Sequence, residues 1–304
     1  MLDLGCVATF LVVASCSGFR EAAKKTGLSQ PTVTQHIKRL EQSLNASLIE
    51  RKNDGCILTL QGREFLPFAE HLIQLSERAQ ALFRKNAIVI GASSNAGIYL
   101  LQPHLKTYQE SSSCEMEIVI GKNPDIADKL ERLEIDVAIM EWWDNRPGYV
   151  AQFWRHEELV LIVPNDHRWA DRQSIPRDWL IGERLLGGEP GTGTSRVLQQ
   201  YFGNNAQSIG VSIQLGSTEA VKRAVQAGLG ISLVMASAVE LESREGRLKA
   251  IALENDSPKK EIFIIRRQTE PHHVPPAVEF ANFLLKQEWP NLTQKASVKA
   301  TASV

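Results

Sequence analysis

Four glycine-rich and hydroxyl-rich segments of the sequence have the residue types that bind a small anion. Each segment opens a predicted helix, where backbone N–H groups point outward and favour negative charge. A carboxylate, phosphate or sulfur oxyanion would suit such a site. The alternative is that each Ser or Thr only caps its own helix. The candidate anion-binding residues are Ser93, Ser94, Asn95, Asn123, Glu189, Gly191, Thr192, Gly193, Thr194 and Thr218.

Two further candidates, Glu141 and Trp142, directly follow a predicted strand at residues 137–140. Together with Trp143, Trp142 could form an apolar or π-rich wall over a ligand. The alternative is that the two tryptophans pack at a subunit interface. We add Glu141 and Trp142 to the candidate ligand site.

A catalytic or metal site is not expected. The sequence contains neither a G-x-S-x-G nucleophile elbow nor a G-x-x-x-x-G-K-[ST] phosphate loop, and its histidines are scattered. Cys6, Cys16, Cys56 and Cys114 form no Cys-x-x-Cys pair and have no histidine at ligand spacing. Reduced thiols in a reducing compartment are the simplest interpretation, and a redox sensor is the alternative. We therefore expect no catalytic residue, no metal and no cofactor.

A second set of polar residues has the chemistry needed to contact DNA bases. Gln pairs with adenine, the Thr hydroxyl and methyl suit thymine, and Lys reaches guanine or a phosphate. A predicted helix at 30–44 exposes Gln30, Thr32, Thr34, Gln35 and Lys38. The alternative is a polar, solvated helix in an ordinary bundle.

The neighbouring residues predict how this helix is positioned. A short helix at 20–27 ends at Gly27, which accepts the left-handed conformation that stops a helix. Ser29 then suits the N-cap of the next helix, and Pro31 suits its first turn. Two helices joined by so tight a turn indicate a helix-turn-helix, whose second helix enters the DNA major groove.

The opening apolar residues could instead be an export signal. Residues 7–16 resemble the core and cleavage box of a lipoprotein signal peptide, but the only charge before Arg20 is the acidic Asp3. As a helix, the segment places on one buried face Leu4, Val7, Ala8, Leu11 and Ala14. The helix is favoured, and with it a cytoplasmic location.

Residues 47–59 predict a strand, a turn at 53–55 and a second strand. A hairpin after a recognition helix is a wing, which would bring Arg51 and Lys52 to the phosphate backbone. The helix predicted at 59–83 carries a long apolar stripe, which is typical of a helix that pairs with its own copy. The alternative is packing within its own chain, and Pro67 is expected to kink the helix.

Composition sets the wider limits. A chain of 304 residues with 43% apolar and 23% charged residues suits about two globular domains. The net charge is −1, so attraction to nucleic acid must come from local clustering. Residues 20–52 provide it, with seven Lys or Arg against three Asp or Glu. No apolar run reaches the roughly 18 residues of a membrane span, and no membrane contact is expected.

From residue 87 the pattern changes to strands alternating with helices, which predicts parallel α/β sheets. Strands are expected at 88–90, 116–120, 137–140, 159–163, 211–214, 231–234 and 262–265, and helices at 96–110, 126–133, 218–227 and from about 193. Two such sheets joined by two crossings would hold a ligand between them, outside the carboxyl ends of the strands.

Several motifs resemble those of LysR-type transcriptional regulators. Residues 10–23, FLVVASCSGFREAA, follow the family's F-x-x-V-A-x-x-G-S-F-x-x-A-A with Ser17 and Gly18 in swapped order. Residues 28–34, 48–51 and 58–62 match its L-S-Q-P-A-V-S, L-F-x-R and L-T-x-x-G, with Ile49 replacing the usual Phe. The resemblance implies contacts to bases and phosphates from Gln30, Pro31, Thr34 and Gln35, and contacts to the DNA backbone from Ser29 and Arg51.

The second half resembles the periplasmic-binding-protein-like effector domain of the same family. Residues 189–194, EPGTGT, are similar to the E-x-G-S-G-T-R segment of a subgroup that includes regulators of carbon fixation and sulfur assimilation. Ser195 stands in place of the subgroup's Arg, so a different effector is expected. In the wing, Asp54 is an acid where many relatives carry a basic residue.

The sequence thus predicts an α/β protein with an N-terminal all-α, winged helix-turn-helix domain (1–58), a linker helix (59–86), an effector-binding domain (87–292) and a flexible tail (293–304). The effector domain would comprise two Rossmann-like subdomains, about 87–162 with 267–292, and about 163–266. The resemblance implies a transcriptional regulator that contacts promoter DNA through Ser29, Gln30, Pro31, Thr32, Thr34, Gln35, Lys38, Arg51 and Lys52. A small anionic effector, a second copy in a dimer or tetramer and RNA polymerase are the expected partners. A solute-binding protein of periplasmic type is the alternative.

Overall fold

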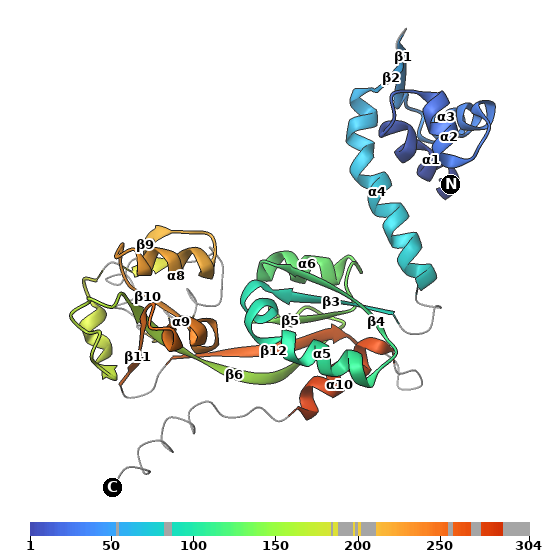
Figure 1. The fold of residues 1–304 in the computed structure, drawn as a ribbon. Coiled ribbons are helices and arrows are strands. Elements are labelled where there is room, and N and C mark those ends of the chain that lie inside the picture. Colours follow the sequence, from blue (N-terminus) through green and yellow to red (C-terminus); the bar gives the residue numbers. More distant parts are fainter. Residues whose placement is uncertain are drawn as a thin grey trace. The chain divides into compact units, whose positions relative to one another are not determined.

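The computed structural model describes residues 1–52, 55–81, 87–183, 185–187, 197, 200–201, 211–254, 258–268 and 275–287. The chain forms two compact units, Met1–Lys85 and Asn86–Val304, called here the N-terminal and C-terminal units (Figure 1). The wing residue Asp54, the predicted anion-binding segment 189–195 and the tail 293–304 lie outside the described residues.

The N-terminal unit is a winged helix with a long helix after the wing. Its elements are α1 (Leu4–Ala14), α2 (Phe19–Thr26), α3 (Gln30–Leu44), β1 (Ile49–Lys52), β2 (Gly55–Leu58) and α4 (Leu60–Ala81). Gly27 closes α2 with a left-handed φ of 70°, and Ser29 Oγ accepts a hydrogen bond from Thr32 N at 3.2 Å where α3 begins. Both predicted helix caps are confirmed, and α4 runs through Pro67 without a break.

The buried face of α1 differs from the predicted one. Leu4 is exposed, and only Val7 of the predicted set is fully buried, because the core lies instead along Cys6, Val7, Phe10 and Val13. Both α3 and α4 pack on α1, and the rings of Phe10 and Phe65 lie 5.5 Å apart. Two neighbouring helices therefore select the face, which the apolar spacing of α1 alone could not show.

The swapped residues Ser17 and Gly18 lie at the contact between the helix junction and the wing. The Ser17 N–H and hydroxyl both donate to Glu21 Oε2, at 2.9 and 2.8 Å, which lowers the pKa of Glu21 and anchors the start of α2. Cys56 N donates to Ser17 O at 3.1 Å. Gly55 is needed beside this bond, since its φ is 146° and a Cβ there would lie 2.1 Å from Ser17 O.

Gly62, in the first turn of α4, allows a second close approach of backbone. Its N–H donates to Thr59 Oγ1 at 2.9 Å, so Thr59 is the predicted helix cap. A Cβ on Gly62 would lie 2.1 Å from Leu48 O, at the start of the wing. This contact gives a physical reason for the glycine of the L-T-x-x-G pattern.

Gly62→Ala is expected to destabilise the N-terminal unit by about 1–3 kcal/mol, as overpacking does. Helix propensity alone would favour Ala by about 1 kcal/mol, so a loss of stability must come from the clash with Leu48. Urea unfolding measures the change, with the exposed neighbour Gln61→Ala as the matched control. Equal stability of the two variants would contradict the close approach.

The first half of the C-terminal unit is a sheet covered on both faces. Its elements are β3 (Ala87–Ser93), η1 (Ala96–Leu100), α5 (Gln102–Ser111), β4 (Glu115–Gly121), α6 (Asn123–Glu131), β5 (Val137–Met140) and α10 (Pro276–Lys286). β3 pairs in parallel with β4 on one side and with β5 on the other. Apolar clusters place α6 on one face of the sheet and η1, α5 and α10 on the opposite face (Figure 1).

The second half contains shorter elements around two apolar clusters. They are β7 (Ser174–Ile175), η2 (Arg177–Leu180), β8 (Leu185–Gly187), β9 (Val211–Gln214), α8 (Thr218–Gln226), β10 (Ser232–Met235), η4 (Ala236–Ala238), α9 (Glu240–Arg244) and β11 (Lys249–Leu253). The parallel pair β8 and β9 forms a small sheet of its own.

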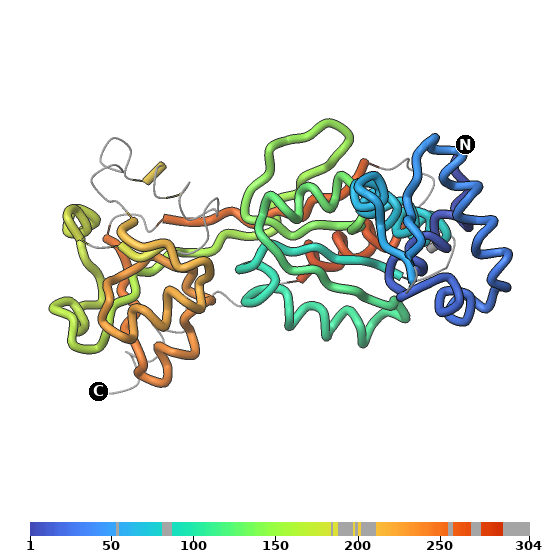
Figure 2. Tube along the Cα trace, turned by 90° about the horizontal axis from the view of Figure 1, so that it is seen from above, coloured from blue at the N-terminus to red at the C-terminus, as the bar shows by residue number. Residues whose placement is uncertain are grey.

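Two long strands, β6 (Tyr149–Val163) and β12 (Lys259–Arg267), join the two halves (Figure 2). They pair antiparallel over most of their length, with a register shift between Ile262 and Phe263. They provide the two predicted crossings, but the strands of both halves join into one eight-stranded sheet in the order β4-β3-β5-β12-β6-β11-β7, with β10 also on β6. The predicted strand 159–163 is only the end of β6, and the predicted helix 96–110 is divided into η1 and α5.

Candidate effector site and DNA-binding surface

The first turns of α3 present the predicted base-reading residues. Gln30, Pro31, Gln35 and Lys38 are exposed, as is the cap Ser29, whereas Val33, Ile37 and Leu40 on the opposite side are buried. Thr32 and Thr34 are half-buried rather than exposed. Each threonine hydroxyl is held within the protein, Thr32 by Ser29 Oγ at 2.8 Å and Thr34 by Arg51 at 3.2 Å.

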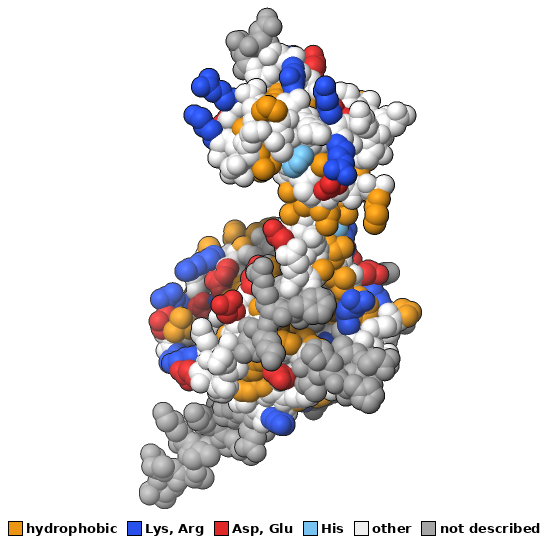
Figure 3. Space-filling model, turned by 90° about the vertical axis from the view of Figure 1, so that its right-hand side faces the viewer, with side chains coloured by type: hydrophobic (Ala, Val, Ile, Leu, Met, Phe, Trp, Pro, Cys, Tyr) orange, Lys and Arg blue, Asp and Glu red, His pale blue; other side chains and the backbone are white. Residues whose placement is uncertain are grey.

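Arg51 links the wing to the reading helix. Its guanidinium lies 4.3 Å from the centre of the Phe19 ring and donates to Thr34 Oγ1. Lys52 is exposed next to it on β1. Figure 3 shows Lys and Arg side chains on the face of the N-terminal unit that is turned to the viewer. A cation fixed beside the base-reading face is well placed for a phosphate on the same stretch of DNA.

Glu41, which the sequence patterns did not single out, fixes the wing to α3. Its Oε1 accepts hydrogen bonds from the backbone N–H groups of Leu48 at 2.7 Å and Ile49 at 3.1 Å. From the other side, Thr59 Oγ1 donates to Ser47 O at 2.6 Å. A Glu late in a polar helix carries no sequence signal for such a contact, because its partners are backbone groups.

The strand order of the C-terminal unit reverses at β3, which lies between β4 and β5. The chain leaves β3 on one side to form β4 and returns to its other side to form β5. Ligands of open α/β sheets bind where the strand order reverses in this way. Ser93, Asn95 and Glu141 lie at these strand ends, and Asn123 begins the helix that follows β4.

A buried polar network connects these residues. Asn95 Nδ2 donates to Glu141 Oε1 at 3.0 Å, and Asn95 Oδ1 accepts from Thr218 Oγ1 at 2.7 Å. Asn123 Oδ1 accepts from the N–H of Glu141 at 3.0 Å. Lys260 Nζ lies 2.6 Å from Glu141 Oε2, and their side chains are only 1% and 3% exposed. Thr218 begins α8 in the second half of the unit, so the network spans both halves.

A second contact joins the two halves nearby. Tyr99 OH, from η1, donates to Glu219 Oε1 on α8 at 2.7 Å, and burial together with Glu219 raises the pKa of Tyr99. Burial alone would raise the pKa of Glu219, but hydrogen bonds from Lys222 and Tyr99 outweigh it and lower that pKa. The buried Lys222 also pairs with Glu242 at 2.8 Å. These contacts and the Thr218–Asn95 bond hold the halves together at the strand ends.

The Ser93 hydroxyl stands out among the predicted anion-binding groups. It is buried at the end of β3 and has no hydrogen-bond partner among the residues that the structure describes. A buried hydroxyl without a partner costs about 1–3 kcal/mol, and such groups call for an explanation in terms of a bound ligand, water or ion. Ser94 Oγ, in contrast, donates to Gly121 O at 3.1 Å.

The structure assigns different surroundings to Glu141 and Trp142 than the sequence suggested. The Glu141 carboxylate is buried and bound by Asn95 and Lys260. This arrangement favours a role in positioning Asn95 over direct contact with a ligand. Trp142 is half-buried, and its carbonyl accepts from Asn123 Nδ2 at 3.1 Å. Trp143 packs within its own chain, with its ring centre 5.5 Å from that of Tyr149.

Sequence reasoning missed Lys260, Tyr99 and Lys222. Lys260 is 119 residues from Glu141 and Tyr99 is 120 residues from Glu219, so no local pattern connects them. The predicted residues Glu189, Gly191, Thr192, Gly193 and Thr194 lie outside the described residues, so the facing loop of the second half is not placed. Among the described residues, no group of three or more His, Cys, Asp or Glu could hold a metal ion.

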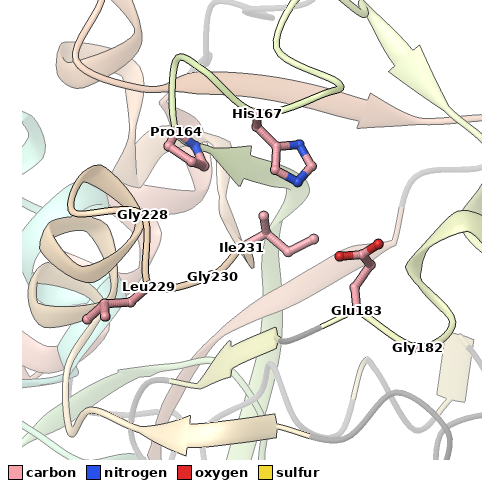
Figure 4. Close-up of a pocket in the computed structure, with 8 residues that line it drawn as sticks. All are labelled: Pro164, His167, Gly182, Glu183, Gly228, Leu229, Gly230 and Ile231. Carbon is pink, nitrogen blue, oxygen red and sulfur yellow. The ribbon is translucent and has the colours of Figure 1, made fainter.

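A separate pocket of about 310 Å³ lies in the second half of the C-terminal unit (Figure 4). Its lining comprises Pro164, His167, Gly182, Glu183, Gly228, Leu229, Gly230 and Ile231. His167 Nδ1 accepts a hydrogen bond from Trp169 N at 3.3 Å, and burial lowers the pKa of His167. This contact gives His167 a structural role in the turn that follows β6.

Two family models match the chain. One, described as the LysR substrate binding domain, matches residues 84–289, and the other, described as the bacterial regulatory helix-turn-helix protein of the lysR family, matches residues 5–63. A relative from Stutzerimonas stutzeri, named as the HTH-type transcriptional regulator protein PtxE, is 40% identical over 196 residues, which are 64% of this chain and all of the relative. The RuBisCO operon transcriptional regulator of Allochromatium vinosum is 26% identical over 91% of this chain and 94% of its own length.

Solved structures show the same fold. Full-length CbnR, in a complex with its target DNA, aligns with a TM-score of 0.73 at 20% identity, covering 93% of this chain and 99% of CbnR. A mutant of OxyR from Corynebacterium glutamicum aligns with a TM-score of 0.61 at 25% identity, covering 99% of this chain and 94% of that one. No helix among the described residues is long and apolar enough to cross a membrane.

Proposed function

The chain belongs to the LysR family of effector-responsive, DNA-binding transcriptional regulators, and from that premise we propose that a small anion is its effector. The anion would bind at the strand ends between the two halves of the C-terminal unit. Binding there would change how the N-terminal units of an oligomer engage promoter DNA. The single observation that carries the proposal is the buried Ser93 hydroxyl, which has no partner among the described residues.

The proposed DNA contacts come from the exposed start of α3 and from the wing. Gln30, Pro31 and Gln35 would read base edges, whereas Arg51 and Lys52 would contact phosphates. Ser29, Thr32, Thr34 and Lys38 complete the proposed surface. The buried opposite side of α3 supports this assignment, because it leaves the polar side free to enter a groove.

The proposed oligomer is a dimer built on α4, with a tetramer as its larger form. Along α4, Leu60, Phe68 and Leu75 are exposed, and the Phe68 side chain is 68% exposed. Exposed apolar residues repeated along one long helix favour pairing with a second copy. RNA polymerase is proposed as a further partner on the promoter.

The chemistry of the site supports an anion. Ser93, Ser94 and Asn95 offer hydroxyl and amide groups at the end of β3, and α6 and α8 begin at the same edge. Helix starts favour negative charge, and Ser217 Oγ already caps α8 by accepting from Ala220 N at 3.1 Å. The acidic Glu141 is neutralised by Lys260, so it does not repel an anion.

A switching mechanism follows from the contacts between the halves. The Thr218–Asn95 and Tyr99–Glu219 hydrogen bonds hold the halves together. A ligand that bonds Ser93, Asn95 or Thr218 would replace one of these contacts, and would thereby change the relative populations of two arrangements of the halves. The spacing of paired winged helices and the bend of the DNA would then change as well.

A thermal-shift experiment tests the anion. Sodium salts of carboxylates, phosphate and sulfur oxyanions are added to the full chain at matched ionic strength, with neutral sugars as the comparison. An anion present at 100 times its Kd is expected to stabilise the folded protein by about 2.7 kcal/mol and to raise its Tm. The proposal would be overturned if the neutral sugars raised the Tm and none of the anions did.

Ser93→Ala sharpens the test. Ser93 Oγ has no partner among the described residues. If Ser93 had only a structural role, Ser93→Ala would have unchanged or higher stability, and the anion would raise its Tm by as much as it raises that of the natural protein. The proposal predicts instead that the anion raises the Tm of Ser93→Ala less than that of the natural protein, while the stability without the anion is unchanged. Ser243→Ala, which removes another buried hydroxyl without a described partner, is the matched control. DNase protection that is identical with and without the active anion would contradict the switching mechanism.

The remaining predictions belong to the same proposal. The relatives reported above are transcriptional regulators, and we propose action through binding without catalysis, in the cytoplasm where promoter DNA is found. The division into residues 1–58, 59–86 and 87–292, with subdomain limits near 162 and 266, is proposed on the same grounds. A solute-binding protein is disfavoured, because it offers no use for the winged helix.

A further inference from the structure

Cys16 and Cys56 come together where the helix junction meets the wing. Cys16 lies between α1 and α2, and Cys56 lies on β2. Cys56 N donates to Ser17 O at 3.1 Å, and Gly55 approaches the same carbonyl so closely that no side chain fits. Both cysteines are half-buried and pack against the same apolar cluster of the N-terminal unit.

A backbone contact brings the two cysteines close together. Disulfides join Cα atoms about 4.4–6.8 Å apart, and the hydrogen bond from Cys56 N to Ser17 O, at 3.1 Å, brings the two backbones into contact. Cys16 is the direct neighbour of Ser17, which makes this bond. The thiols also interact electrostatically, since the pKa of Cys56 is raised first by burial and next by the charge of Cys16, with Arg51 opposing.

The surroundings give the two cysteines different chemistry. The pKa of Lys25 is raised first by its interaction with Cys16 and next by Glu21, whose carboxylate lies 3.4 Å from Lys25 Nζ. A thiolate on Cys16 is therefore faced by an ammonium group, whereas burial disfavours a thiolate on Cys56. The thiolate is the attacking species in thiol–disulfide exchange, so Cys16 is the first nucleophile and Cys56 resolves the intermediate.

We infer that Cys16 and Cys56 form a redox-sensitive pair whose disulfide weakens DNA binding by the winged helix. The oxidant is a small organic disulfide. The Cys16 thiolate attacks one of its sulfurs, its S–S bond breaks, and one thiolate leaves and takes up a proton. Cys56 then loses its proton and attacks the Cys16 sulfur of the mixed disulfide, releasing the second thiol. Two protein thiols are oxidised and one small disulfide is reduced to two thiols.

The register of the wing connects this bond to DNA binding. Arg51 is the direct partner of Cys56 in the β1–β2 hairpin, and it also donates to Thr34 on the reading helix. A covalent link from Cys56 to Cys16 pulls β2 toward the helix junction and moves Arg51 relative to α3. This step rests on the proposed function, whereas the disulfide itself forms whether or not the chain binds DNA.

The first experiment identifies the disulfide. The full chain is treated with oxidised glutathione, the remaining thiols are alkylated, and the peptides are mapped by mass spectrometry. A Cys16–Cys56 linkage is expected in the natural sequence and in the controls Cys6→Ser and Cys114→Ser, and no internal disulfide is expected in Cys16→Ser or Cys56→Ser. Four unlinked cysteines, or a link between another pair, would overturn the inference.

The second experiment measures DNA affinity. The probe is a double-stranded fragment selected from random sequence by the reduced protein. Oxidation is expected to weaken binding about tenfold, with recovery after dithiothreitol, and to leave Cys56→Ser unaffected. A Cys16–Cys56 disulfide with unchanged affinity would overturn the control of DNA binding. Failure of the reduced protein to select any DNA would instead overturn the proposed function, and the peptide map would still decide whether the pair forms.

Discussion

Lys260→Met is expected to destabilise the C-terminal unit by about 3–5 kcal/mol, because it leaves the Glu141 carboxylate buried without a counter-charge. The two side chains are nearly inaccessible, and Lys260 Nζ lies 2.6 Å from Glu141 Oε2. Glu141 also accepts from Asn95, which bonds Thr218 across the halves. The substitution should therefore reduce ligand-induced stabilisation as well as basal stability.

Urea unfolding of the full chain measures the effect, followed by tryptophan fluorescence. The double variant Glu141→Gln, Lys260→Met removes both charges and is expected to recover a large part of the loss, since an apolar replacement of a whole buried pair is often neutral. Lys249→Met, at an exposed position of β11, is the matched control. Exposed ion pairs usually contribute up to about 1 kcal/mol. If the free energy of unfolding of Lys260→Met lay within about 1 kcal/mol of the natural protein's, the buried ion pair would not have the importance assigned to it.

Arg51→Ala is expected to weaken binding to every DNA sequence alike, by about tenfold or more, because it would remove the proposed phosphate contact. It also frees Thr34 Oγ1 and uncovers the Phe19 ring, which loosens the wing from the reading helix. Gln35→Ala instead removes an exposed side chain that is proposed to read a base, and it should relax the base preference with a smaller effect on random DNA.

Affinity for a selected site and for random DNA is measured at several salt concentrations by fluorescence anisotropy. Arg51→Ala should lower the salt dependence by about one released counterion, whereas Gln35→Ala should leave the salt dependence unchanged. Lys106→Ala, which removes one exposed charge from α5 in the other unit, is the matched control. The assignment would be wrong if Arg51→Ala changed only the sequence preference.

Local signals allowed the N-terminal unit to be predicted well. Gly27, Ser29 and Pro31 act within one turn of the helices that they end or begin, so their types alone place the reading helix. The exposed side of α3 followed from the same boundaries. The buried face of α1 did not, because α3 and α4 decide it from positions far along the chain.

Long-range pairing limited the prediction of the C-terminal unit. Residues 149–158 of β6 carry Gln, Arg, His and Glu side chains, so their sequence pattern does not indicate a strand. Only the pairing of these residues with β12 reveals the strand. The rule that ligands bind at strand ends led to Ser93, Asn95 and Thr218, because it depends only on the order of elements. It could not lead to Lys260, whose partner is set by how two distant strands align.

The paired strands β6 and β12 restrict how the two halves of the C-terminal unit can move. A hinge in a loop moves by rotation about single backbone bonds. Two hydrogen-bonded strands form a ribbon instead, and such a ribbon deforms mainly by twisting. The register shift between Ile262 and Phe263 interrupts the ladder and is the place of least torsional resistance. Lys260 lies two residues before it. A rotation of one half against the other would therefore twist this ribbon, and the Glu141–Lys260 pair lies next to the register shift.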